Sequence, residues 1–173
     1  MLDAISQTSL NVTKTPTNGI TNSDPAGVKT IAAPLTASVY YVGTGSYTPI
    51  YPTLYDLAES ISQRGATPNL IDIRIVSSIT DNRTAVFGAS PLGDNKIFFV
   101  SPHTGMTGLG LTNNSTDPNS AIISVEGANN FNILGYTYNS FDFTQSFSMI
   151  KGGNGTVVKV QNAQQFRFDN VKC

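Results

Sequence analysis

The chain has 173 residues and a mass of 18.4 kDa, which is enough for one domain with a sizeable core. Only 12% of the residues are charged and the formal net charge is −1, whereas Asn, Ser and Thr together account for 53 residues. This composition excludes the basic surface that nucleic acid binding requires. No apolar run is long enough to insert into a membrane, and the single cysteine, Cys173, excludes an intrachain disulfide.

Residues 1–37 contain no aromatic side chain and carry the pairs Thr-Pro, Asp-Pro and Ala-Pro. Such a segment cannot bury enough apolar surface to offset the entropy of ordering it. We therefore expect an extended linker or an attachment arm. The first eight residues lack the basic and apolar regions of a secretory signal, so either the protein does not use general secretion or a signal has been removed.

Residues 38–42 are β-branched and aromatic and are followed by glycines, which predicts a strand. A short α-helix is then predicted over residues 53–64, with Thr53 as its N-cap and Gly65 as its end. One apolar stripe follows the helical period, at Leu54, Leu57, Ala58 and Ile61. The helix therefore has one buried face, and we expect it to cover the end of a core.

Beyond Gly65 the pattern indicates strands and turns only. Residues 71–75 alternate isoleucine with Asp72 and Arg74, which predicts a strand with one solvated face. Further short apolar segments follow, separated by turns rich in Gly, Asn and Ser, at residues 86–87, 97–100, 122–125, 131–133, 147–150, 157–160 and 166–168.

Residues 122–133 and 157–168 form an internal repeat with an offset of 35, in which all six apolar positions coincide. If the two copies are stacked strands, Phe131 lies over Phe166 and their rings stack inside the core. The turn between the two strands would form a ladder of side-chain amides, with Asn129 and Asn130 over Gln164 and Gln165.

Strong apolar strands begin at Ile71, Ile97, Ile122 and Val157, so the steps between them are 26, 25 and 35 residues. A nearly constant step is typical of a solenoid, in which successive coils bury the apolar face that one coil cannot cover. The longer last step predicts one expansion within residues 135–155.

The order of strand, Gly-Thr-Gly, helix and regularly spaced apolar strands resembles the pectin-lyase-like right-handed parallel β-helix superfamily. The resemblance covers about residues 38–173. It implies an all-β fold, a right-handed parallel β-helix (solenoid), with a short N-terminal capping α-helix. Viral tailspikes and surface fibres of this superfamily are similarly rich in Asn, Ser, Thr and Gly, and the resemblance to them implies a homo-oligomer, with a trimer expected.

The superfamily closes the C-terminal end of the coil with a further element, whereas this chain stops soon after residues 166–168. An uncovered coil exposes a strand edge and apolar surface. We expect either a truncated fragment of a longer protein or an end that docks on another chain.

No catalytic, cofactor or metal site is predicted. The 11 carboxylates show no spacing that marks a catalytic pair, and the only histidine, His103, lies in a predicted turn without a partner motif. The clustered aspartates of the Ca²⁺-dependent lyases of the superfamily have no counterpart in this sequence.

The sequence predicts a carbohydrate-binding site at Tyr136, Tyr138 and Asn139, because aromatic faces beside amides suit the apolar and polar sides of a sugar. The period of two between the tyrosines is equally consistent with side chains that alternate into the core.

Three functions stay open at this point. The first is a structural or binding protein, part of a viral or phage fibre or tailspike-like protein that attaches to host carbohydrate at the virion surface or outside the cell. The second is the N-terminal part of a polysaccharide lyase or glycoside hydrolase whose active site lies elsewhere. The third is an inert solenoid spacer of a cell-surface adhesin.

Overall fold

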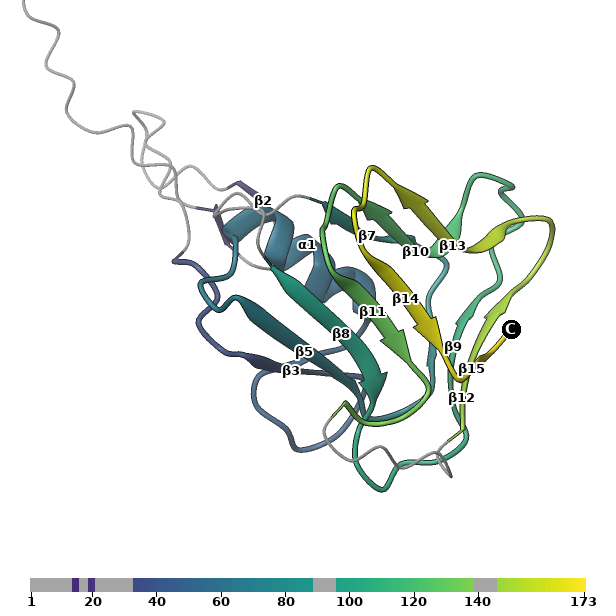
Figure 1. The fold of residues 1–173 in the computed structure, drawn as a ribbon, viewed down its shortest axis with the longest axis horizontal. Coiled ribbons are helices and arrows are strands. Elements are labelled where there is room, and N and C mark those ends of the chain that lie inside the picture. The colour runs from purple at the N-terminus through teal and green to yellow at the C-terminus, as the bar shows by residue number, and fades with distance from the viewer. Residues whose placement is uncertain (1–13, 16–18, 21–32, 89–95, 139–145) are drawn as a thin grey trace, which may run out of the picture.

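The computed structural model describes residues 14–15, 19–20, 33–88, 96–138 and 146–173 (Figure 1). Its folded body consists of three parallel β-sheets and one short α-helix, and a separate antiparallel pair of two-residue strands precedes them. The six-stranded sheet has the order β14 (Phe166–Asp169), β11 (Phe131–Leu134), β8 (Ile97–Pro102), β5 (Leu70–Ile75), β3 (Val39–Val42) and β4 (Ile50–Tyr51). The three-stranded sheet has the order β13 (Thr156–Gln161), β10 (Ala121–Glu126) and β7 (Ala85–Gly88). The four-stranded sheet has the order β15 (Val171–Lys172), β12 (Phe147–Lys151), β9 (Leu109–Asn113) and β6 (Ile79–Thr80).

The chain visits the three sheets repeatedly in one order. Strands β5, β6 and β7 form one such pass, followed by β8, β9 and β10, and then by β11, β12 and β13. Each strand therefore pairs in parallel with the strand three elements later, so the connection between parallel neighbours runs through the other two sheets. The prediction of an all-β fold with parallel strands and one helix is confirmed.

The pairing register between the last two passes has the predicted offset of 35 residues. Strand β10 pairs with β13 through Ile123↔Val158, and β11 pairs with β14 through Phe131↔Phe166. The turns between these strands also correspond, since Gly127 and Asn162 both have positive φ, 84° and 55°. Glycine and asparagine are the residues that adopt this left-handed backbone at least cost.

The predicted step from Ile97 to Ile122 is wrong, because these residues lie in different sheets. Ile97 belongs to β8, whereas Ile122 belongs to β10, which pairs with β7 and β13. The strand that pairs with β8 is β11, and Phe98 faces Phe131 thirty-three residues later. Apolar runs alone do not distinguish one sheet from another, and this explains the error.

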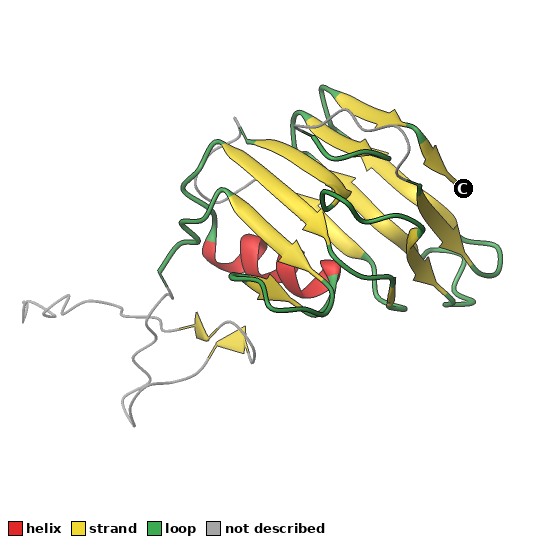
Figure 2. Cartoon of the chain, turned by 90° about the horizontal axis from the view of Figure 1, so that it is seen from below, coloured by secondary structure: helices red, strands yellow, loops and turns green. Residues whose placement is uncertain are grey.

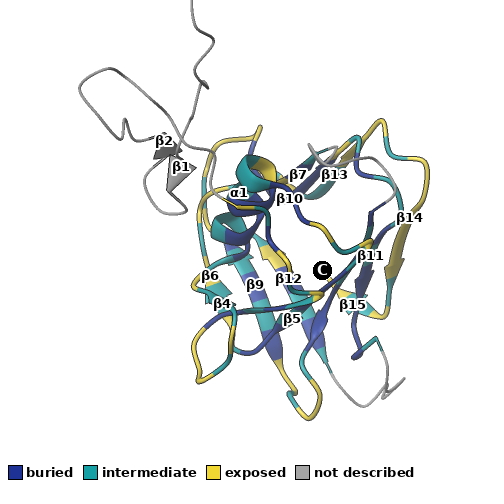
Figure 3. Ribbon diagram, turned by 90° about the vertical axis from the view of Figure 1, so that its left-hand side faces the viewer, coloured by how far each residue is buried: buried dark blue, intermediate teal, exposed yellow. Residues whose placement is uncertain are grey.

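Buried apolar residues from all three sheets form one core cluster. In Figure 3 the strands coloured as buried surround the interior of the stack. Three phenylalanines meet there, with the ring centroids of Phe98 and Phe131 5.4 Å apart and those of Phe87 and Phe131 4.9 Å apart. All three side chains are at most 2% exposed. Burial of one such side chain contributes about 1.5–3 kcal/mol to the free energy of unfolding.

Helix α1 (Leu54–Arg64) begins and ends where the sequence predicts. The Thr53 hydroxyl accepts a hydrogen bond from the Asp56 amide (3.2 Å) and donates one to the Asp56 carboxylate (2.8 Å), and Gly65 ends the helix. Its apolar stripe is buried in the same core cluster as the strands. Figure 2 shows α1 lying against one end of the stacked strands.

The predicted arm, residues 1–37, lies largely outside the described residues. Strands β1 (Lys14–Thr15) and β2 (Gly19–Ile20) pair with each other in antiparallel orientation. Leu35 is part of the core, because it is buried and forms a parallel bridge with Ala66. The folded body therefore includes residues that composition alone assigns to the arm.

Candidate functional site

The predicted carbohydrate site is not an open binding surface in the described residues. Tyr136 is 2% exposed, and its hydroxyl donates to Asp169 (2.9 Å) and accepts from Arg167 (3.1 Å). Burial and then the bond to Asp169 raise the pKa of Tyr136. The ring of Tyr138 stacks on Phe99 with centroids 3.8 Å apart, and Asn139 lies outside the described residues.

The predicted ladder residues lie in adjacent passes. Phe131 and Phe166 are register partners, but Phe131 is fully buried whereas Phe166 is 37% exposed. At the turn, the backbone amide of Gln164 donates to the side-chain oxygen of Asn129 (3.3 Å). The backbone amide of Phe131 donates to the backbone carbonyl of Gln165 (3.0 Å). Asn130 adopts positive φ, 55°. The bonds along this turn therefore use backbone amides as donors.

The outer face of the six-stranded sheet gathers polar and aromatic side chains that lie far apart in the sequence. Strand register places Tyr41, Arg74 and Ser101 in one row across β3, β5 and β8. Asp72 and Phe99 form the neighbouring row of the same face. Because side chains alternate along a strand, all of these face away from the core.

Three rings form a cluster at one edge of this face. Tyr41 and Tyr47 stack with centroids 4.6 Å apart, and His103 meets both rings edge-on at 5.5 Å and 5.2 Å. All three side chains are partly exposed. Tyr47 comes from the loop after β3 and His103 directly follows β8, so the cluster joins two passes.

A buried ion pair lies beside the rings. Arg74 donates to one carboxylate oxygen of Asp72, through Nε at 2.8 Å and Nη2 at 2.7 Å, and the Asp72 side chain is 3% exposed. Three buried polar atoms here have no hydrogen-bond partner among the described residues, namely Asp72 Oδ1, Ser101 Oγ and His103 Nδ1. Such atoms need a partner such as a bound water, since an unsatisfied buried group is costly.

Burial lowers the pKa of His103, and the positive charge of Arg74 lowers it further, while Asp72 acts in the opposite direction. The imidazole is therefore neutral at neutral pH, with one ring nitrogen as a donor and the other as an acceptor. We call Tyr41, Tyr47, Asp72, Arg74 and His103 the outer-face site. Its partly exposed rings and the Arg74 guanidinium offer apolar faces and donors to a polyhydroxylated ligand, whereas the buried Asp72 carboxylate holds the guanidinium in place.

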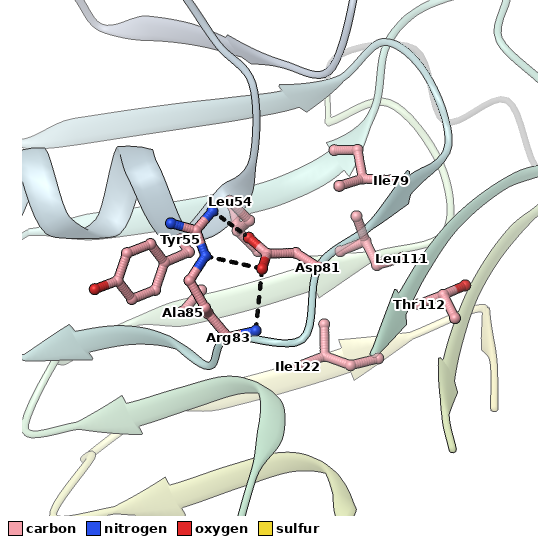
Figure 4. A pocket seen from close by; sticks show the side chains of 9 residues that line it. All are labelled: Leu54, Tyr55, Ile79, Asp81, Arg83, Ala85, Leu111, Thr112 and Ile122. Atoms are coloured by element: carbon pink, nitrogen blue, oxygen red, sulfur yellow. Dashed lines mark hydrogen bonds and ion pairs between the residues drawn. The ribbon is translucent and has the colours of Figure 1, made fainter. Parts of the chain in front are cut away.

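A second place of interest is the small pocket between α1, β6 and β9 shown in Figure 4. Arg83 donates to Asp81 at 2.8–2.9 Å and to Asp56 at 3.2 Å, and its guanidinium lies 4.2 Å from the Tyr55 ring centroid. The cavity is about 20 Å³, which is enough for one water molecule but not for a sugar. These contacts therefore attach the helix to the strands.

A wider groove of about 420 Å³ lies between α1 and strands β7 and β10. Two carboxylates line it: Glu59, which accepts a bond from Gln63, and Glu126, which accepts one from the Ser124 hydroxyl at 2.8 Å. The other lining residues are Tyr55, Ser62, Thr84, Val86 and Gly88. This volume is within the range of small-ligand sites.

The prediction of a solvated strand face is wrong at Asp72, which is 2% exposed, whereas Arg74 is partly exposed. The sequence predicts Tyr41 within a strand and His103 in a turn without a partner, and so does not bring them together with this pair. Side chains alternate between the two faces of a strand, so a sequence that places Tyr40 in the core also places Tyr41 on the outer face. This alternation is the signal that could have indicated Tyr41.

No family model, curated protein or solved structure matches this chain. Within the described residues, no group of three or more His, Cys, Asp and Glu side chains could hold a metal ion. The only helix found in that part of the chain is too short to cross a bilayer.

Proposed function

We propose that the chain forms a right-handed parallel β-helix of the pectin-lyase-like kind and is part of a viral or phage fibre or tailspike-like protein. Three parallel sheets visited in a fixed order support the solenoid. The helix over one end supports the resemblance to this superfamily. Right-handed winding is expected because parallel crossovers have this hand in nearly all proteins.

The proposed activity is attachment to host carbohydrate through the outer-face site. The observation that carries this proposal is the cluster of Tyr41, Tyr47 and His103 beside the ion pair of Asp72 and Arg74. Sugars present an apolar face to aromatic rings and hydroxyls to polar groups. Strands β3 and β5 hold Tyr41, Asp72 and Arg74 in place, which reduces the entropy lost on binding.

The test is a glycan array followed by titration calorimetry with the best glycan. Tyr47→Ala removes the ring that the loop after β3 contributes to the cluster and is expected to weaken binding about two- to tenfold, in line with about 0.5–1.5 kcal/mol for one aromatic contact. Phe168→Ala is the control, because it removes a partly exposed ring from β14, away from both the outer-face site and the groove beside α1. Equal affinity of wild type and Tyr47→Ala for the glycan would refute the outer-face site.

The fibre proposal also includes assembly, with a homotrimer expected, and a place at the virion surface or outside the cell. Light scattering at tens of micromolar tests the assembly. A strict monomer at that concentration would contradict a fibre built from this chain alone.

The groove beside α1 favours a second candidate, a polysaccharide-degrading enzyme. Glycoside cleavage uses two carboxyl groups that flank the bond, and Glu59 and Glu126 line one groove. An assay for new reducing ends or unsaturated sugars tests this, with Glu126→Gln and Glu59→Gln expected to abolish any activity. Binding without cleavage supports attachment, and a chain that neither binds nor cleaves glycans is a spacer.

A further inference from the structure

The last pass through the sheets leaves three strand edges without a strand partner in the described residues. These are the outer edges of β13, β14 and β15, each the terminal strand of its sheet, and we call them the open end. Their inward side chains Val160, Phe166 and Phe168 are 42%, 37% and 38% exposed. The corresponding residues one pass earlier, Val125, Phe131 and Ile133, are fully buried.

The outward side chains of the open end carry positive charge. Lys159 is on β13, Arg167 on β14 and Lys172 on β15, so each terminal strand has one cation on its outer face. Their register partners one pass earlier are the neutral residues Ser124, Asn132 and Ser148. The cations are therefore a property of the open end and are not repeated from the pass below.

Part of this charge is available to a partner. Arg167 is paired with Asp169, yet its side chain is 58% exposed, and Lys172 is exposed. Among the residues that the structure describes, the Lys159 ammonium donates to one backbone carbonyl, that of Asn119, and to no carboxylate. Three cations and one carboxylate lie on the three strands, which leaves the open end with a net positive charge.

We propose that the open end binds a polypeptide segment whose strands carry carboxylates opposite Lys159, Arg167 and Lys172, with apolar side chains at the alternate positions. Strands pair about 4.8 Å apart, so a stacked strand places its outward side chains directly beside these cations. Like charges at that spacing destabilise pairing and opposite charges stabilise it. The same rule disfavours a second copy of this end, which would face its own cations.

The binding mode is β-strand addition, in which unpaired backbone groups supply affinity and alternate side chains supply specificity. The surface does not involve the outer-face site, so glycan binding and strand binding are separate properties of the chain. Failure of one leaves the other testable.

The probe is a synthetic peptide of residues 122–134, labelled for fluorescence anisotropy, with Ser124→Glu and Asn132→Glu. In the chain this segment lies directly beneath β13 and β14 and has the apolar pattern that fits them. A second peptide with Ser124→Lys and Asn132→Lys differs only in charge. The 173-residue chain is expected to bind the acidic peptide at least tenfold more tightly than the basic one.

The charge-reversal protein carries Lys159→Glu and Arg167→Glu and is expected to prefer the basic peptide. Arg167 also contacts Asp169 and Tyr136, so the double variant could lose stability for a reason unrelated to binding. The single variant Lys159→Glu avoids this problem and should weaken binding of the acidic peptide about threefold. Thr104→Glu, in an exposed turn on another surface, is the control.

Absence of binding to either peptide, or equal affinity of the wild-type protein for both, would overturn the proposal. So would an equal loss of affinity in Thr104→Glu and Lys159→Glu, since bulk charge would then explain the effect. A dimer that Val160→Lys dissociates would show that a second copy occupies the open end, which also contradicts the proposal.

Discussion

The rings of Phe98 and Phe131 stack at an interplanar angle of 29°, although thirty-three residues separate them in the chain. They are register partners on β8 and β11, so one pass of the chain brings equivalent side chains into contact. The contact shows how this fold builds its core from neighbours along the stack.

Phe131→Ala is expected to lower the free energy of unfolding by about 3–5 kcal/mol, because it leaves a cavity between Phe87 and Phe98. Urea denaturation measures the loss. Phe166→Ala, at the register partner, removes a side chain that is already 37% exposed and should cost clearly less. Equal losses at the two positions would mean that Phe166 is covered in solution.

Gly135→Ala is expected to be strongly destabilising. A Cβ atom at this position would lie 1.6 Å from the Asn170 carbonyl oxygen, so the turn between β14 and β15 would have to move. We expect a loss of about 1–3 kcal/mol, typical of an overpacked site, measured by thermal and urea denaturation. Gly88→Ala is the control, because its Cβ would make only an ordinary contact at 3.4 Å. Similar losses in both variants would contradict the close approach.

Arg83→Ala is expected to lower the free energy of unfolding by about 0.5–1 kcal/mol, since the Arg83 side chain is 48% exposed and solvent screens its ion pairs. Burial tends to raise the pKa of Asp81, but hydrogen bonds from Arg83 and Thr53 outweigh this effect and the pKa lies below its usual value. A carboxylate of this kind stabilises the fold above about pH 4 and loses that effect as the pH falls through its folded pKa.

The wild-type protein should therefore lose stability below about pH 4 more steeply than Arg83→Ala, whose Asp81 lacks its cation. Urea midpoints at pH 7 and pH 3.5 check the difference. Arg83→Lys keeps the charge without the two-point contact and should fall between them. Parallel pH profiles for all three proteins would show that Arg83 does not hold the Asp81 pKa down.

His103 gives the fold a second pH dependence, in a different range. Its pKa in the folded protein lies below the ordinary value of 6.5, because burial and Arg74 oppose the charged form. The unfolded chain therefore binds the proton more readily, and stability falls as the pH drops below about 6.5 until the folded pKa is reached.

His103→Gln, which keeps a polar side chain but does not titrate, should remove this loss between pH 7.5 and pH 5.5. Denaturation midpoints at the two pH values measure it. If glycan binding uses the outer-face site, the affinity of the wild-type protein should change only once the pH reaches the lowered pKa of the folded protein, while that of His103→Gln stays constant. A wild-type midpoint that does not change with pH would show that the imidazole is not shielded.

The helix and the 35-residue register could be predicted because both depend on patterns within short segments. Thr53 and Gly65 mark the helix ends through local hydrogen bonding, and the two repeated segments have the same length between their apolar positions. The step from Ile97 to Ile122 failed because an apolar run shows that a strand is buried, but not which sheet contains it.

The outer-face site could not be predicted in the same way. Tyr41 meets His103 only because β3, β5 and β8 pair in one register, and Tyr47 joins them from a loop. The burial of Tyr136 likewise depends on Asp169 and Arg167, which lie in a later pass. To predict such contacts between passes, one would need to know the lengths of all the intervening turns.

The spacing between stacked partners is not constant: Ile79 and Leu111 are thirty-two residues apart, whereas Leu111 and Met149 are thirty-eight. Both pairs are nonetheless adjacent strands of one sheet. The extra residues therefore lie in the connections between strands. Each pass still adds one strand spacing, about 4.8 Å, to the length of the stack. Insertions or epitope tags placed in these connections should therefore add surface loops without increasing the length of the stack of strands.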